Sequence, residues 1–395
     1  MIYFDNAATT FPKPMCVKNA VDEALLRYGA NPGRSGHELA AQTSLRIYEV
    51  REKAASFFGA EDVEQVAFTQ NCTHSLNTVI KGLLRPGDHV VISDLEHNSV
   101  LRPVYALAAK GIITYSVAET FADPVKTELS FCHAIRPNTR AIIATHASNV
   151  FGLKLPAKRL GKIARKYGIY YIMDAAQTAG TEHINMKEMQ IDFLCTAGHK
   201  GLYGPTGTGL LITPYGKKLI PLMEGGTGSV SHEYAQPDFM PDHLESGTLN
   251  TMGIIGLGAG LDFVAHCGID GIAQREMQVI TTIYDMLEQC KDVILYTKRP
   301  ALEAQAAVLS FNIKGLNSEE TASKLNELGF AVRGGMQCAP LAHKKFGTSQ
   351  TGTVRISAGA FNTVEQGRAL AEAVKRIVNS PGKELQTPQK KIDLP

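Results

Sequence analysis

The chain has 395 residues, with 40 Lys or Arg against 38 Asp or Glu, and its formal net charge is +2 at pH 7. This near balance excludes a general electrostatic attraction to nucleic acid or to an anionic membrane, so small molecules or proteins are the expected partners. The length predicts two domains, because a domain usually takes about 100–200 residues.

Three further features of the sequence limit the class of protein. No apolar run reaches the roughly 18 residues that a membrane span needs, and the start MIYFDNAATT lacks the basic leader and apolar core of a signal peptide. The seven cysteines are odd in number and scattered, which favours a reducing cytoplasm over a disulfide framework. The sequence contains neither a CxxC pair nor HExxH, so we expect no metal site.

The first two thirds of the chain alternate between short strand patterns and helical patterns, which predicts a mostly parallel α/β sheet. An early helix carries the apolar stripe Ile47, Val50, Ala54, Phe57 and Phe58 at a period of 3.6 residues. The expected strands of the sheet are residues 66–68, 89–93, 112–117, 141–145, 170–174, 193–196 and 210–213.

Beyond about Cys267 the pattern changes and predicts a second, smaller α+β domain. Long helices are expected at residues 270–291, 318–328 and 363–378, with short strands near 308–313 and 353–357. We therefore divide the chain into an N-terminal segment 1–14 near the active site, a large domain 15–265, a small domain 266–379 and a flexible tail 380–395.

Polar residues follow several of the predicted strands, and open α/β sheets bind ligands beyond the carboxyl ends of their strands. Cys72 and Thr73 begin a helix, where free backbone N–H groups suit a phosphate. His97, Asn149 and Asp174 follow later strands. Taken singly, each of these residues is more often a helix cap or a packed polar side chain.

Lys200 follows the strand at 193–196 within TAGHKGLYGP, where a lysine stands among glycines. A lysine that forms a Schiff base, a carboxylate for a pyridine nitrogen and a phosphate cradle are the parts that pyridoxal 5′-phosphate (PLP) requires. We therefore interpret Lys200 as the cofactor lysine and expect the glycines to leave room for a flat cofactor.

Nine motifs follow one another along the chain: YFDNAATT, NPGRSGHELA, LEHNSV, THASNVFG, MDAAQ, GHKGLYGPTGTG, ESGTLNT, VRGGMQCAP and VRISAGAFNT. In this order they resemble the cysteine desulfurase and selenocysteine lyase family, which are PLP enzymes of fold type I in the class V aminotransferase group. The similarity runs from about Tyr3 to about Val378. The resemblance implies a large domain with a seven-stranded, mostly parallel sheet and a smaller α+β C-terminal domain.

The resemblance also implies a role for each matching residue. Lys200 would bind PLP covalently, Cys338 would accept sulfur, and His97 would stack on the cofactor ring, so these three are the expected catalytic residues. The expected cofactor-binding residues are Cys72, Thr73, His97, Asp174, Ala176, Gln177, His199, Lys200 and, from the other subunit of a homodimer, Thr248. The expected substrate-binding residues are Ala8, His37, Asn149, Arg333 and Arg355.

Two positions depart from the family pattern. Ala197 stands where relatives often carry a serine, which removes one hydroxyl contact to the phosphate. Gln337 stands where relatives often carry a histidine before the acceptor cysteine, and a neutral amide cannot help to deprotonate a thiol.

The reaction implied by the resemblance converts L-cysteine to L-alanine and leaves a persulfide on Cys338, from which an acceptor protein collects the sulfur. Three alternatives stay open. Two are enzymes: a selenocysteine lyase, and another class V aminotransferase or lyase in which Cys338 is incidental. The third is a sulfur-relay protein that uses the scaffold chiefly to dock partners. A dinucleotide enzyme is a weaker alternative, since neither GIIGLGAGL nor GPTGTG lies within a βαβ unit as that fingerprint requires.

Overall fold

The computed structural model describes residues 1–33 and 36–379, so the expected tail 380–395 and two residues of the NPGRSGHELA motif lie outside the described residues. The chain divides into two compact units. Unit 1 comprises Met1–Pro12, Ala147–Lys154 and the described chain from Asp270 onward. Unit 2 comprises Lys13–His146 and Leu155–Ile269.

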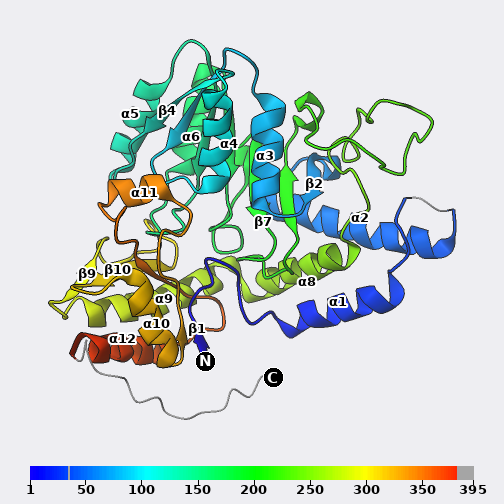
Figure 1. The fold of residues 1–395 in the computed structure, drawn as a ribbon. Helices are drawn as coiled ribbons and strands as arrows, with labels where there is room; N and C mark the ends of the chain where they lie inside the picture. Colours follow the sequence, from blue (N-terminus) through cyan, green and yellow to red (C-terminus); the bar gives the residue numbers. More distant parts are fainter. Residues whose placement is uncertain (34–35, 380–395) are drawn as a thin grey trace. The chain divides into compact units, whose positions relative to one another are not determined.

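Unit 2 is built on a seven-stranded sheet with the order β2-β8-β7-β6-β5-β3-β4 (Figure 1). Only β8 runs against its two neighbours, β2 and β7, and the other strand pairs are parallel. This confirms the expected mostly parallel sheet, and each expected strand is present with ends within two residues of the expected ones. The strands are β2 (Val66–Thr69), β3 (His89–Ser93), β4 (Thr114–Ala118), β5 (Thr139–Thr145), β6 (Tyr170–Asp174), β7 (Phe193–Ala197) and β8 (Gly209–Ile212).

Helix α2 (Glu38–Phe58) of unit 2 buries the apolar positions that its period predicts, except Phe57, which is half-buried. In α2, Ile47, Val50, Ala54 and Phe58 are buried, and the helix ends at Gly59 in the left-handed conformation. The other helices are α1 (Met15–Arg27), α3 (Cys72–Leu83), α4 (Asn98–Ala109), α5 (Pro124–Ala134), α6 (Ala157–Tyr167), α7 (Met186–Met189) and α8 (Thr251–Cys267), with the short 3-10 turns η1 (Val63–Gln65) and η2 (Gly216–Lys218).

The glycine-rich stretch GIIGLGAGL forms part of helix α8, whose small residues let it pack closely on other elements of unit 2. A Cβ on Gly258 would lie 2.5 Å from Val50 Cγ2 in α2, and one on Gly260 would lie 2.2 Å from Leu202 O. These glycines therefore serve helix packing, and the stretch is no dinucleotide-binding loop.

Unit 1 contains two small sheets. The N-terminal strand β1 (Ile2–Tyr3) pairs in parallel with β11 (Phe330–Ala331). The second sheet is antiparallel with the order β12-β10-β9, formed by β12 (Val354–Ser357), β10 (Val308–Ile313) and β9 (Val293–Leu295). The helices are α9 (Ile269–Leu287), α10 (Ser318–Glu327), α11 (Pro340–Lys345) and α12 (Val364–Asn379).

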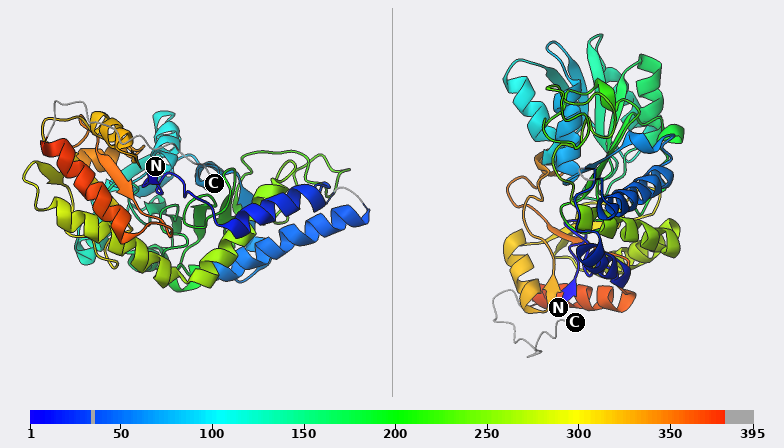
Figure 2. Two further views of the ribbon diagram at one scale, coloured as in Figure 1. Left: turned by 90° about the horizontal axis from the view of Figure 1, so that it is seen from below. Right: turned by 90° about the vertical axis from the view of Figure 1, so that its right-hand side faces the viewer.

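The core of unit 1 brings together the start of the chain and its last third. Phe4 packs in one cluster with apolar residues of α9, β10, β12 and α12. Gly367 of α12 lies against Val279 and Ile283 of α9, and the two helices run past each other in Figure 2. Within the described residues no single helix is long and apolar enough to cross a membrane; only α8 and α9, taken together as a broken pair, reach that length and composition.

Candidate functional site

Lys200 lies in a turn that directly follows β7, beyond the carboxyl end of this strand. The glycines around it are packed against protein atoms. A Cβ on Gly198 would lie 2.2 Å from Thr208 Oγ1, and one on Gly201 would lie 2.4 Å from Ala179 O. The expectation that these glycines leave room for a cofactor is therefore wrong: they let the lysine loop pack tightly onto neighbouring backbone.

Asp174 ends β6, the strand next to β7, and its side chain is buried with only 4% of the residue exposed. The backbone N–H of Ala176 donates to Asp174 Oδ1 at 2.9 Å, and the Cys72 thiol donates to the same oxygen at 3.3 Å. Burial, followed by the charge of Asp174, raises the pKa of Cys72 well above its ordinary value. Cys72 is therefore a protonated thiol that orients the carboxylate.

His97 and Thr73 are linked through Ser99. The backbone N–H of Ser99 donates to His97 Nδ1 at 3.0 Å, so a neutral His97 carries its proton on Nε2. The Ser99 hydroxyl lies 2.8 Å from His97 Nδ1 and 2.7 Å from Thr73 Oγ1. The first turns of α3 and α4 are thus joined at the carboxyl edge of the sheet.

His199 precedes Lys200 and is held in a positively charged environment. Burial, and then the charges of Lys200 and Lys13, lower the pKa of His199 to about 4. The ammonium of Lys13 donates to the carbonyl oxygen of His199 at 2.7 Å, and burial lowers the pKa of Lys13 to about 8. A neutral imidazole beside two cations suits contact with an anion.

Three expected residues of unit 2 lie at less enclosed positions. Gln177 is half-buried in the turn after β6. Thr248 is exposed and lines a cavity of about 290 Å³, together with the buried ion pair between Arg51 and Glu245. His37 is exposed and accepts from the backbone N–H of Ala40 as the N-cap of α2. Neither His37 nor Thr248 thus has a position that by itself indicates a ligand.

In unit 1 the expected substrate residues Arg355 and Asn149 are in direct contact. Arg355 is 2% exposed; its guanidinium forms an ion pair with Asp5 and donates through Nη1 to Asn149 O at 3.1 Å. Two buried polar atoms, Arg355 Nε and Asn149 Oδ1, have no hydrogen-bond partner. Burial is also the main cause that lowers the pKa of Arg355. Buried polar atoms without partners are rare, and a polar ligand would satisfy both of these.

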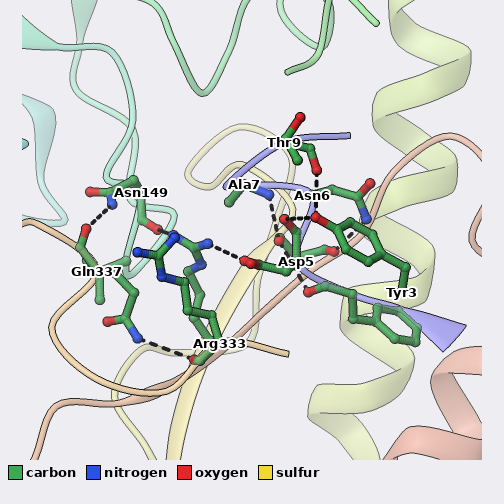
Figure 3. Close-up of polar contacts among 12 residues, drawn as sticks. Tyr3, Asp5, Asn6, Ala7, Thr9, Asn149, Arg333 and Gln337 are labelled. Atoms are coloured by element: carbon green, nitrogen blue, oxygen red, sulfur yellow. Dashed lines mark hydrogen bonds and ion pairs between the residues drawn. The ribbon is translucent and has the colours of Figure 1, made fainter. Parts of the chain in front are cut away.

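Cys338 is exposed and follows Gln337, which is buried. Asn149 Nδ2 donates to the carbonyl oxygen of Gln337 at 2.6 Å (Figure 3). Asn149 therefore contacts both the turn that carries Cys338 and Arg355 in unit 1. Arg333, at the start of the same turn, is exposed and pairs through its backbone with Arg355. Ala8 lies in the N-terminal turn that begins at Asp5, where its N–H donates to Asp5 O at 3.0 Å.

The sequence did not single out Asp5 and Ser99, which hydrogen-bond to candidate site residues, or Glu96, which precedes His97 in the chain. These residues belong to the motifs YFDNAATT and LEHNSV, but nothing in those strings indicates which side chains are buried. Glu96 is fully buried, accepts from the backbone N–H of Thr145 at 2.9 Å, and has its pKa raised to about 8 mainly by burial. Glu96 is thus a neutral acid at pH 7, next to His97 in the chain.

Among the described residues no group of His, Cys, Asp and Glu could hold a metal ion.

The family described as Aminotransferase class-V matches residues 2–370. A probable cysteine desulfurase of Methanothermobacter thermautotrophicus is 35% identical, with 95% of this chain and 94% of the relative covered. One from Pyrococcus abyssi is 33% identical, with 96% and 95% covered. Among solved structures, the apo cysteine desulfurase of Thermococcus onnurineus is 33% identical, with a TM-score of 0.88 over 96% of this chain and 95% of that one. The cysteine desulfurase CsdA of Escherichia coli is 28% identical, with a TM-score of 0.84 and 95% and 94% covered.

Proposed function

The chain belongs to the class-V aminotransferase family, and on that premise we propose that it is a PLP-dependent cysteine desulfurase, which converts L-cysteine to L-alanine. The observation that carries the proposal is a buried carboxylate, Asp174, at the end of the strand beside the one that leads to Lys200. Likeness to proteins named cysteine desulfurase over nearly the whole chain supports the same reaction.

The residues of unit 2 fit PLP. Cys72 and Ala176 donate to Oδ1 of the Asp174 carboxylate, and we assign Oδ2 to a protonated ring nitrogen. Lys200 would hold the cofactor through its amine and His97 would lie on its ring, while Gln177 would donate to its phenolic oxygen. Thr73 and His199 would bind its phosphate. When bound, PLP supplies an acceptor for the electrons that a substrate α-carbon releases.

The chain's own groups would then bind the amino acid and move its protons. Lys200, once displaced by the substrate amine, would take the α-proton. Arg355 and Asn149 would hold the substrate carboxylate: the planar guanidinium suits a carboxylate, and its Nε is a buried donor without a partner. We place Ala8, His37 and Arg333 near the substrate from the family resemblance.

Cys338 is the proposed sulfur acceptor. Its thiolate would attack the sulfur of bound cysteine, a sulfur–sulfur bond would form, and the carbon–sulfur bond would break with its electron pair going to the carbon. The products are a persulfide on Cys338 and, after protonation at the carbon, alanine. Its exposed position leaves the persulfide accessible to an acceptor, which we propose to be a protein in the cytoplasm.

We also propose that the active unit is a homodimer, in which Thr248 completes the phosphate site of the partner. Exposed apolar side chains on α1 support a buried surface in the assembly, since Leu26 is 84% exposed and Leu25 and Met15 are each more than half exposed. Sedimentation of the PLP-loaded protein should give a dimer; a fully active monomer at assay concentration would contradict this.

The deciding experiment incubates the PLP-loaded protein with L-cysteine, L-selenocysteine and a set of other amino acids, and identifies the products by mass. We expect alanine from cysteine and an added mass of one sulfur atom on the Cys338 peptide. Alanine from selenocysteine alone would indicate a selenocysteine lyase. A 2-oxo acid from another amino acid, with no alanine from cysteine, would indicate an aminotransferase.

A further inference from the structure

Gln337 and Cys338 form a turn whose backbone conformation is unusual. Both residues have positive φ angles, 41° and 59°, although neither is glycine. Non-glycine residues keep the left-handed conformation only where their surroundings hold it in place. The side chains of the two residues differ in burial: Gln337 is 4% exposed, whereas Cys338 is exposed.

The carboxamide of Gln337 is hydrogen-bonded on both sides. Its Nε2 donates to Thr353 O at 2.7 Å and to Arg333 O at 3.3 Å. Its Oε1 lies 3.2 Å from Thr353 Oγ1 and 3.1 Å from His343 Nε2. The side chain therefore joins the turn to the residue before β12 and to helix α11, and it is directed into unit 1.

His343 completes this arrangement as a buried neutral histidine. Burial lowers its pKa, and Nδ1 lies 2.8 Å from the hydroxyl of Thr348. Because Gln337 Oε1 can only accept, the proton lies on His343 Nε2, and Nδ1 accepts from Thr348. A single tautomer thus satisfies both neighbours.

The backbone of Gln337 makes a second connection, to the cluster that we assign to the substrate carboxylate. Its carbonyl oxygen accepts from Asn149 Nδ2 at 2.6 Å (Figure 3). In turn, Asn149 O accepts from Arg355 Nη1 at 3.1 Å. Asn149 therefore contacts both the turn that carries the Cys338 thiol and Arg355, with which it is proposed to bind the substrate carboxylate.

We propose that Gln337 is a positioning residue for sulfur transfer: its buried carboxamide fixes the left-handed turn that presents the Cys338 thiol in register with Asn149. This inference rests on the proposed desulfurase function. This role differs from that of a base, which would take a proton from the thiol. The Gln337 side chain is hydrogen-bonded to Thr353 and His343, and it serves to hold the turn.

Two variants test this role with the PLP-loaded protein. Gln337→Ala removes the carboxamide, and Gln337→Met keeps its length without its hydrogen bonds. Met336→Ala is the matched control, since Met336 is exposed in the same turn. Each protein is assayed with L-cysteine and with L-cysteine sulfinate, whose sulfur leaves as sulfur dioxide without attack by a thiol. Amide hydrogen exchange of residues 333–339 is measured in parallel.

We expect kcat with cysteine to fall about tenfold or more in both Gln337 variants, because small displacements of a reacting group are costly. Any rise in KM should be shared by the two substrates, which carry the same carboxylate, while kcat with the sulfinate stays within about twofold of wild type. Amide exchange at 333–339 should become faster in both variants and remain unchanged in Met336→Ala.

Equal losses of kcat with cysteine and sulfinate would overturn the proposal, because they would indicate a general loss of structure. Unchanged kcat with cysteine would overturn it as well. If Gln337→Ala does not fold, the isosteric Gln337→Met decides. If wild type forms no alanine from cysteine, the proposed function fails, and amide exchange alone decides whether Gln337 fixes the turn: exchange as slow as wild type in both variants would refute it.

Discussion

The Lys200 loop of unit 2 and the Cys338 turn of unit 1 present their reactive groups by different physical means. Lys200 follows a central strand, and glycines let its loop pack directly on backbone. Cys338 lies in a turn of two non-glycine left-handed residues, held by the side chain of Gln337. The first loop is thus fixed by backbone packing and the second by side-chain hydrogen bonds, so single side-chain changes should disturb the second more readily.

The most severe test of this comparison is Lys200→Ala. If backbone packing alone fixes the loop, the variant keeps its fold but loses alanine formation by about 10³-fold or more, because the amine that binds the cofactor is gone. The visible absorption band of the PLP-loaded protein should disappear. Borohydride reduction and peptide mapping of wild type should label Lys200; label on another lysine would contradict the assignment. Lys217→Ala, at an exposed position of unit 2, is the control.

Cys338→Ala tests the reactive group of the other region. We expect alanine formation from cysteine to fall by about 10²-fold or more, with the absorption band retained, since the carbon–sulfur bond then lacks its nucleophile. Cys267→Ala replaces another exposed cysteine and should be silent. Full activity of Cys338→Ala would exclude the persulfide mechanism.

Arg355→Lys tests whether the proposed substrate site of unit 1 depends on the planar geometry of the Arg355 guanidinium. Lysine cannot pair with Asp5 and also donate two parallel hydrogen bonds to a carboxylate, so KM for cysteine should rise about tenfold, with a smaller change in kcat. Arg299→Lys makes the same exchange at an exposed ion pair with Asp285 and should leave KM unchanged. An unchanged KM in Arg355→Lys would remove Arg355 from the proposed substrate site.

The smallest expected effect concerns the stability of unit 2. The pKa of Glu96 is about 8 in the folded protein and 4.5 as its ordinary value, so between these pH values the folded state holds a proton that the unfolded state has lost. Its contribution to stability is full below pH 4.5 and is lost as pH rises through 8, with a slope of at most about 1.4 kcal/mol per pH unit.

Glu96→Gln should therefore flatten the fall in the free energy of unfolding between pH 5 and 8, as measured by urea denaturation at a series of pH values. Glu52→Gln changes an exposed carboxylate of the same unit and should leave the profile as in wild type. If the profile of Glu96→Gln matches that of wild type, Glu96 is ionised in the folded protein.

The sequence by itself determined most of unit 2. Strand patterns at 89–93 and 170–174 match β3 and β6 residue for residue, because alternation of short apolar runs with helical periods is a local signal. The edge that carries His97, Asp174 and Lys200 followed from the same signal, since the carboxyl ends of parallel strands meet at one side of a sheet. The family resemblance then gave each residue an expected role.

Only the tertiary structure decided how unit 1 holds the Arg355 guanidinium and the turn that carries Cys338. Asp5 and Arg355 lie 350 residues apart in the chain, and β1 pairs with β11 across a similar separation. The inward direction of the Gln337 side chain was likewise unpredictable, because it depends on Thr353 and on His343 in α11. Local periodicity reports which residues favour a helix or a strand, whereas partners across such separations are selected by the packing and hydrogen bonding of the whole unit.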